Sequence, residues 1–257
     1  MPDRSSLLAL TPAADPGWVD LRGLLLSGRY ELFSDGDPAN GLVARSLDFP
    51  FGVAAGRPAV EVVQRAVENV AAAGTAWAGE ISPDEWHLLT GEETVDAVAP
   101  ALPDWRTRGV TIHRRERLPE RPIGDVEGVE IRIAPHGWRA AALDLAHLPS
   151  ELLAEYESPW MLERPLAVAL IDDRVAALCS AAFETERYWD VAVDTLEPYR
   201  RRGLAAACFE ALAVDRREAR GLEPVWGALD DNRASMGLAE RLGFRPVRRL
   251  TSFVRRG

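Results

Sequence analysis

The stretch Tyr199-Arg200-Arg201-Arg202-Gly203-Leu204-Ala205-Ala206-Ala207 places three arginines and a glycine directly before an alanine-rich segment. This order predicts a loop that ends at Gly203 and a helix that follows it. The first amides of a helix have no intrahelical acceptor, and the helix dipole makes that end positive. A glycine there lets a phosphate approach the backbone closely. A plain solvated loop is the alternative, but three cations at a helix start are unfavourable without an anion.

The composition limits what that anion can be. The chain of 257 residues carries 30 basic and 40 acidic side chains, a net charge of −10, which argues against nucleic-acid or anionic-membrane binding. A small anionic ligand is therefore favoured. The two cysteines lie in apolar runs with no metal-ligand spacing, so we expect buried thiols and no metal. The apolar stretch Leu7–Leu10 is too short for a signal peptide or a membrane span, which predicts a cytoplasmic protein.

The second half of the chain alternates strand and helix patterns. Three consecutive strand patterns imply an antiparallel meander, and strand–helix–strand units imply parallel pairing. We therefore predict an α/β (α+β) fold with a mixed, mostly antiparallel twisted sheet flanked by helices. The expected strands are Val129–Ile133, Leu166–Ile171, Val175–Phe183, Trp189–Thr195, Val225–Leu229 and Val247–Val254, and the expected helices are Ser150–Tyr156, Arg202–Arg220 and Ser235–Leu242.

The first half gives a less regular pattern. The Pro- and Gly-rich segment Leu118–Asp125 is the best linker candidate, so we predict an N-terminal α/β region over 1–122 and a second domain over 126–257. The expected helices of the first region are Val19–Gly28, Val60–Ala73, Pro83–Thr90 and Thr94–Ala101, and the expected strands are Leu42–Leu47, Pro50–Ala55, Thr75–Ile81 and Val110–Arg117.

Two motifs resemble the GNAT superfamily of N-acetyltransferases. The first is Arg200-Arg201-Arg202-Gly203-Leu204-Ala205, which matches Arg/Gln-x-x-Gly-x-Gly/Ala after the fourth strand. The second is Asn232 followed by Leu242-Gly243-Phe244, one helix and one strand later. The resemblance covers about Val129–Val254, and the whole pattern is similar to a bacterial subgroup with an extra N-terminal region.

The resemblance implies the acyl-CoA N-acyltransferase fold and acetyl-CoA as co-substrate. The pyrophosphate would bind at the helix start, and the pantetheine amides would pair with the edge of the fourth strand. Helix capping is the alternative role for Asn232 and for Ser235, which lies three residues later in the second motif. The implied cofactor contacts are Val193, Asp194, Thr195, Arg200, Arg201, Arg202, Gly203, Leu204, Ala205, Asn232 and Ser235.

The catalytic residues follow less clearly. Many family members use a tyrosine in the last helix as the acid, and the corresponding residue here is Ala239. A carboxylate early in the fourth strand is a frequent base, which makes Asp190 the candidate, acting through a water. A solvated strand-end carboxylate is the alternative reading of Asp190. The isolated His113, His136 and His147 are interpreted as structural.

Two functions stay open at this point. The first is an N-acetyltransferase that moves an acetyl group from acetyl-CoA to a primary amine of a small molecule or protein. The second is a non-catalytic acyl-CoA-binding module, which the missing tyrosine permits. The run Phe51–Gly56 before a helix suggests that the first region is a degenerate GNAT-like copy that sets acceptor specificity. A monomer or homodimer without nucleic-acid or membrane partners is expected.

Overall fold

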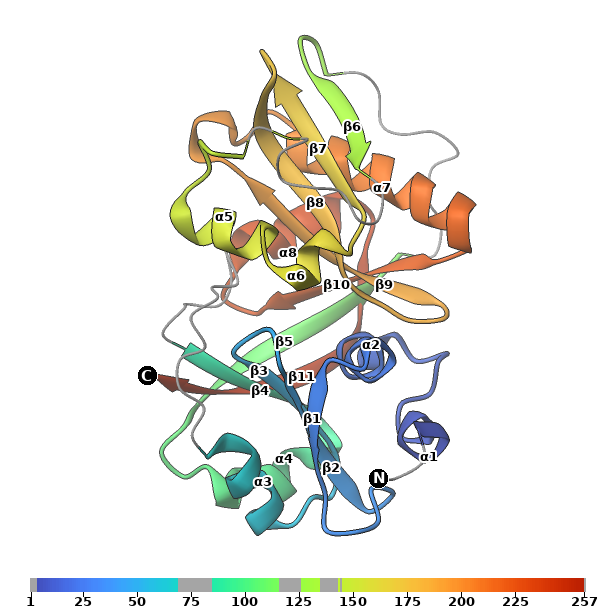
Figure 1. Ribbon diagram of the computed structural model, residues 1–257, viewed down its shortest axis with the longest axis vertical. Helices are drawn as coiled ribbons and strands as arrows, with labels where there is room; N and C mark the ends of the chain where they lie inside the picture. The colour runs from blue at the N-terminus through green and yellow to red at the C-terminus, as the bar shows by residue number, and fades with distance from the viewer. Residues whose placement is uncertain (1–3, 69–84, 116–125, 135–142, 144, 257) are drawn as a thin grey trace.

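The computed structural model describes residues 4–68, 85–115, 126–134, 143 and 145–256. They form one eleven-stranded sheet in the order β1-β2-β3-β4-β11-β5-β10-β9-β8-β7-β6 (Figure 1). The β3–β4 and β9–β10 pairs are parallel, and the other neighbouring strands of this described sheet are antiparallel. Helices lie against the sheet, so the predicted mixed, mostly antiparallel α/β fold is confirmed.

In its described residues the first region contributes five strands and four α-helices. The helix expected near Val19 ends at Gly28, whose φ of 73° gives the left-handed C-cap that favours glycine. The elements are α1 (Arg4–Ala9), α2 (Val19–Ser27), β1 (Tyr30–Phe33), β2 (Gly41–Ser46), β3 (Phe51–Gly56), α3 (Val60–Val67), β4 (Glu85–Gly91), α4 (Glu92–Val98) and β5 (Arg106–Arg114), with short 3-10 helices at Pro16–Trp18 and Ala99–Ala101.

The second region follows the predicted order closely. Asp172 and Asp173, with φ of 51° and 61°, form the tight turn between its second and third strands. The short helix α6 was not predicted; Ser158 caps it by accepting a hydrogen bond from the Met161 amide at 3.2 Å. The elements are β6 (Glu130–Ala134), α5 (Ser150–Tyr156), α6 (Pro159–Leu162), β7 (Leu166–Ile171), β8 (Arg174–Glu184), β9 (Tyr188–Thr195), a 3-10 helix at Glu197–Tyr199, α7 (Leu204–Arg220), β10 (Glu223–Leu229), α8 (Arg233–Arg241) and β11 (Arg245–Arg256).

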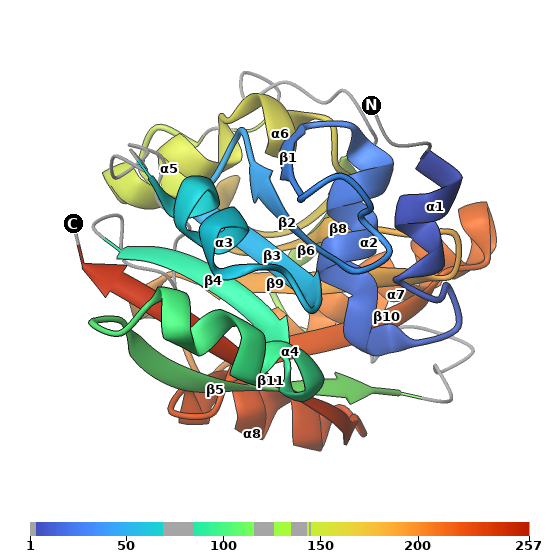
Figure 2. The same ribbon diagram turned by 90° about the horizontal axis from the view of Figure 1, so that it is seen from below.

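The two regions exchange their last strands. The strand β5 of the first region pairs with β10 of the second, and β11 of the second region pairs with β4 of the first. The two exchanged strands also pair with each other, so β4, β11 and β5 lie side by side (Figure 2). The order β3-α3-β4-α4-β5 in the first region thereby matches β9-α7-β10-α8-β11 in the second.

One predicted element of the first region is wrong. Residues expected as the helix Pro83–Thr90 form β4, where Thr90 pairs with both Ala54 of β3 and Thr251 of β11. Strand neighbours on both edges override the weak local preference of this apolar run. The expected strand Thr75–Ile81, the end of the helix Val60–Ala73 and the linker Leu118–Asp125 lie outside the described residues.

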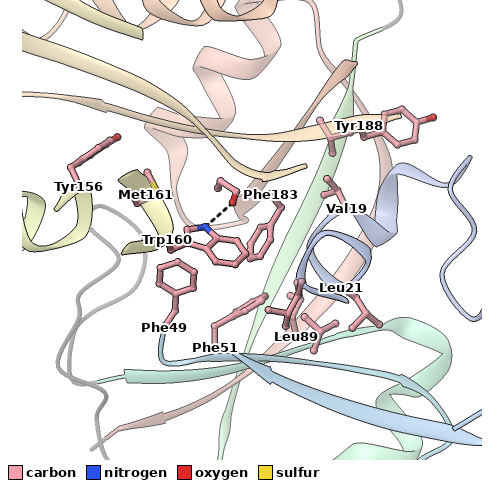
Figure 3. Packing of buried hydrophobic residues seen from close by; sticks show 14 of the residues in the cluster. Val19, Leu21, Phe49, Phe51, Leu89, Tyr156, Trp160, Met161, Phe183 and Tyr188 are labelled. Carbon is pink, nitrogen blue, oxygen red and sulfur yellow. Dashed lines mark hydrogen bonds between the residues drawn. The ribbon is translucent and has the colours of Figure 1, made fainter. Parts of the chain in front are cut away.

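An apolar cluster with side chains from both regions joins them. Figure 3 shows Phe49 and Phe51 of the first region against Trp160 and Phe183 of the second. The ring centroids of Phe49 and Trp160 lie 5.2 Å apart, and those of Phe51 and Phe183 lie 6.0 Å apart. The indole Nε1 of Trp160 donates to the Ala182 carbonyl at 2.9 Å. This core fills the junction between the regions among the described residues.

Candidate functional site

The first part of the site is the place where β9 and β10 stop pairing. Their parallel ladder runs from Tyr188–Glu223 to Asp190–Val225, while β8 accompanies β9 up to Thr195. β10 continues along β5 instead, up to Leu229. The edge of residues 191–195 that faces away from β8 is therefore not covered by β10 over the described strands. An extended amide chain could add to this edge as a strand does.

The second part is the loop that leads into α7. Gly203 is the N-cap of α7 with φ of +83°, and no side chain caps the helix there. Apart from its chain neighbours, no described atom lies within 4 Å of the place that a Cβ on Gly203 would take. Arg201 also has a positive φ, 64°. Successive amides in such a conformation form a concavity that binds anions.

The arginines of this loop carry its charge. Arg200, Arg201 and Arg202 are exposed, and no described acidic residue forms an ion pair with any of them. Arg200 Nε donates to the Thr195 carbonyl at 3.2 Å, and the Arg202 guanidinium lies 5.9 Å from the centre of the Tyr199 ring. These contacts position the loop without neutralising it. The positive potential expected at this helix start is therefore present.

Asn232 and Ser235 of the second motif both have hydrogen-bond partners within the protein. The Asn232 side chain caps α8 by accepting a hydrogen bond from the Ser235 amide at 3.0 Å. The Ser235 hydroxyl accepts from Trp226 Nε1 at 2.9 Å. The predicted capping role is confirmed for Asn232, and cofactor contact by these two residues stays a prediction. Ala239 is fully buried in the core with Phe209, where a tyrosine would have to displace packed side chains.

In the described residues a glycine-led helix start lies beside a strand edge that β10 leaves uncovered, and the resemblance implied cofactor contacts at these two features. Residues 167–253 match the sequence model of the GNAT acetyltransferase family. This segment, from β7 to β11, is therefore similar to GNAT acetyltransferases. A comparison with curated proteins found no significant match.

Solved structures share the fold over almost the whole chain. A GCN5-related N-acetyltransferase-like protein from Streptococcus suis is 18% identical, with a TM-score of 0.64 and 98% of each chain covered. A GNAT-family putative acetyltransferase from Novosphingobium aromaticivorans is 23% identical, with a TM-score of 0.57 and coverage of 93% of this chain and 95% of that one. A tandem GNAT protein of the clavulanic acid biosynthesis pathway, 12% identical, reaches a TM-score of 0.55 and covers 95% of this chain and 96% of its own. The fold shared with these structures therefore includes the first region of this chain.

The candidate base Asp190 lies on β9 with 9% of its surface exposed. Its register partner is Val225 of β10, and its Oδ1 lies 3.8 Å from where a Cβ on Gly227 would be. The faces of β9 alternate as expected: Ala192 packs on the core with Trp160, and Val193 packs on the core under α7. Asp190 therefore shares the Ala192 face, within the paired part of the strand.

Sequence reasoning missed Tyr156 of α5. Its hydroxyl donates to Oδ2 of Asp194, 3.2 Å away, and its side chain is fully buried. Burial holds the pKa of Tyr156 well above its usual value, and the neighbouring Asp194 carboxylate raises it further. This tyrosine is therefore a protonated donor at neutral pH. The chain has four tyrosines, but no sequence pattern links position 156 to a strand 38 residues later.

The histidines have backbone partners. His113 is buried with Nδ1 3.3 Å from the Trp226 carbonyl, and His147 Nε2 lies 2.8 Å from the Val175 carbonyl. These contacts agree with structural roles. His136 lies outside the described residues.

The other sequence expectations concern thiols, metals and membranes. Cys179 and Cys208 are buried free thiols as expected, and burial raises the pKa of Cys208 to about 12. The residues described contain no group of three or more His, Cys, Asp and Glu side chains suited to a metal ion. None of the helices in the described ranges is long and apolar enough to cross a membrane.

A hollow of about 900 Å³ lies elsewhere on the protein, between the N-terminal segment and the start of β11. Asp15, Glu93 and Arg248 line it, and Arg248 joins the two carboxylates. No predicted site residue lines this hollow. The candidate site is therefore defined by the β9 edge and the α7 start.

Proposed function

We propose that this protein is a GNAT N-acyltransferase that moves an acetyl group from acetyl-CoA to a primary amine. One observation carries the proposal: residues 191–206 run without a break from the β9 edge that β10 leaves uncovered into the open, cationic start of α7. Coenzyme A has the same order of groups, a thioester and amide-bearing arm followed by a pyrophosphate. The family match supports an acyltransferase function.

Each part of the strand and loop has a proposed role. Val193, Asp194 and Thr195 would supply backbone groups to the pantetheine and polarise the thioester carbonyl. Arg200, Arg201 and Arg202 would bind the phosphates together with the amides that follow Gly203. Asn232 and Ser235 would lie along the same arm. The acceptor would be a small amine or a protein amine, in the cytoplasm, and the protein would act as a monomer or homodimer.

The first region, 1–122, would shape the acceptor side as a degenerate second copy. Its β3-α3-β4 unit repeats the β9-α7-β10 order, but the turn before α3 is closed. A Cβ on Gly41 would lie 2.2 Å from Pro58 N, so β2 packs directly against the turn before α3, whereas the space around Gly203 before α7 is open. We therefore propose that each chain has one acyl-CoA site and that the domain of residues 126–257 holds it.

A non-catalytic acyl-CoA-binding module is the second candidate, because the buried Ala239 supplies no acid. Acetyl-CoA at about 100 times its Kd should raise the free energy of unfolding by about 2.7 kcal/mol under either function. Thiol release from acetyl-CoA separates them, measured with ethanolamine, spermidine, tryptamine, glucosamine and an alanine-initiated peptide. Stabilisation with thiol release on any of these amines supports the enzyme. Stabilisation without release supports the module, and no stabilisation contradicts both.

A further inference from the structure

The fold leaves a carboxylate and a tyrosine in contact at the proposed reaction centre. Asp194 lies four residues beyond Asp190 on the same face of β9, past the last pair with β10. It is half-buried, and its register partner on β8 is Leu178. Its backbone belongs to the edge proposed to hold the thioester arm. Its side chain therefore stands beside the place where the acyl group would be presented.

Tyr156 reaches that carboxylate from a different element. It is fully buried in the core that contains Leu152 and Trp160, and its hydroxyl donates to Asp194 Oδ2 at 3.2 Å. Figure 3 shows Tyr156 at the margin of the cluster, beside Met161. A buried tyrosine hydroxyl needs a hydrogen-bond partner, and a rigid donor fixes the carboxylate that accepts from it.

We infer that the Asp194 carboxylate is the general base of the transfer and that Tyr156 is its positioning residue. This inference rests on the proposed N-acyltransferase function. Asp190 is the competing base, but it lies where β9 is still paired with β10 and only 9% of it is exposed. Asp194 lies beyond that ladder, next to the amides that would hold the thioester. The proposed base therefore lies outside the paired part of β9 and β10.

The reaction step balances with these groups alone. The amine nitrogen forms a bond to the thioester carbonyl carbon, and its proton moves to the Asp194 carboxylate. The C–S bond then breaks, and the proton passes from Asp194 to the leaving thiolate, which regenerates the carboxylate. An ionised carboxylate has about four lone-pair sites, so it can accept from Tyr156 and from the amine together.

The contact also sets when Asp194 can act. A hydrogen bond donated to a carboxylate favours its ionised form, so loss of the Tyr156 hydroxyl should move the pH at which Asp194 can accept a proton upwards. The titratable neighbours include Tyr156 and the buried Glu155 on α5, Cys179 on β8 and Asp190 on the same strand. Burial holds the pKa of both Tyr156 and Cys179 well above the usual values, so neither ionises near neutrality.

The test measures kcat and KM against pH, using acetyl-CoA and the amine from the panel that gives the fastest thiol release. Asp194→Asn should lower kcat about 100-fold or more while the KM for acetyl-CoA changes less than about threefold, because the backbone contacts stay. Tyr156→Phe should raise the pKa of the acid limb by about half a unit or more and lower kcat mainly below it. Tyr188→Phe is the matched control, since it removes a buried hydroxyl that donates to the Ala14 carbonyl at 3.1 Å, away from the site.

A second substitution protects the test against misfolding of Tyr156→Phe. 3-Fluorotyrosine at position 156 keeps the ring shape and is a stronger donor, so it should lower the acid-limb pKa. Opposite shifts of the acid-limb pKa in the two variants support the positioning role of Tyr156. A purely structural role would not produce opposite shifts. The inference would be overturned if the pKa of the acid limb stayed unchanged in both position-156 variants. It would also be overturned if kcat of Asp194→Asn stayed within about threefold of the parent, or if Asp190→Asn were the variant that lost the acid limb. Absence of thiol release by the unmodified protein on every amine would overturn the proposed enzyme function itself, and this inference with it.

Discussion

The guanidinium of Arg115 donates to Oε1 of Glu210 at 2.7 Å and thereby ties the end of β5 to the middle of α7. Glu210 is fully buried, and the Arg115 guanidinium also lies 5.8 Å from the centre of the Phe209 ring. Burial raises the pKa of Glu210, and Arg115 opposes that shift. A side chain of the first region thus holds the helix whose start is the proposed phosphate site.

Arg115→Ala should destabilise the protein strongly. The substitution leaves the Glu210 carboxylate in the core without its cation, and breaking a buried pair costs about 3–5 kcal/mol. Urea unfolding at pH 7 followed by tryptophan fluorescence measures the loss. The control is Arg132→Ala, because Arg132 and Glu130 pair on the surface with 46% and 58% of their side chains exposed. That change should cost less than about 1 kcal/mol, and equal losses in both variants would contradict the role of the Arg115–Glu210 pair.

Gly203→Val should remove acetyl-CoA binding. The new side chain enters open space at the start of α7, where the pyrophosphate is proposed to approach. Gly221→Val is a close match, since Gly221 ends the same helix with φ of +69° and equally open surroundings. Both variants should lose similar stability from backbone strain, about 1–2 kcal/mol. Only Gly203→Val should lose the rise in Tm that acetyl-CoA gives, and a full rise in that variant would refute the phosphate site.

His87 should make the protein sensitive to acid. It is buried with Nδ1 2.9 Å from the Ser252 hydroxyl, and burial lowers the pKa of His87 to about 4. The unfolded value is about 6.5, so the stability from neutral His87 is complete above that pH and is lost as pH falls towards 4. The loss should be roughly 3 kcal/mol. Urea unfolding of the parent and of His87→Gln between pH 7 and 4 measures the part of this loss that depends on His87. If the free energy of unfolding fell in parallel for both proteins, the role of His87 would be contradicted.

Asp20 should act in the opposite direction. It lines a small apolar hollow with Val53 and Leu89 at the first turn of α2, and burial raises the pKa of Asp20 to about 7. Because the folded pKa lies above the unfolded one, its favourable contribution is complete below about pH 4 and disappears as pH rises through 7. Asp20→Asn should therefore raise Tm at pH 8 and leave it unchanged at pH 4. Asp96→Asn is the control, because Asp96 is exposed. A gain in Tm for Asp20→Asn that does not depend on pH would contradict the role of Asp20 burial.

Local patterns were sufficient for the second region because its elements carry their own signals. The turn residues Asp172 and Asp173, the C′ glycine Gly221 and the apolar runs between them each specify a boundary through short-range sterics. The β4 segment had no such signal. Glu85–Gly91 is a strand because β3 and β11 lie on its two edges, and β11 is supplied from more than 150 residues later in the sequence.

Short-range interactions specify the meander, the glycine-led start of α7 and its positive charge, because helix amides, glycine φ and strand alternation act over a few neighbouring residues. The exchange of β5 and β11 between the regions and the contact of Tyr156 with Asp194 could not be predicted from such local patterns. Those relationships depend on which distant strands pair and which faces are buried together. The free energy that selects them comes from the assembled sheet and the core that joins both regions.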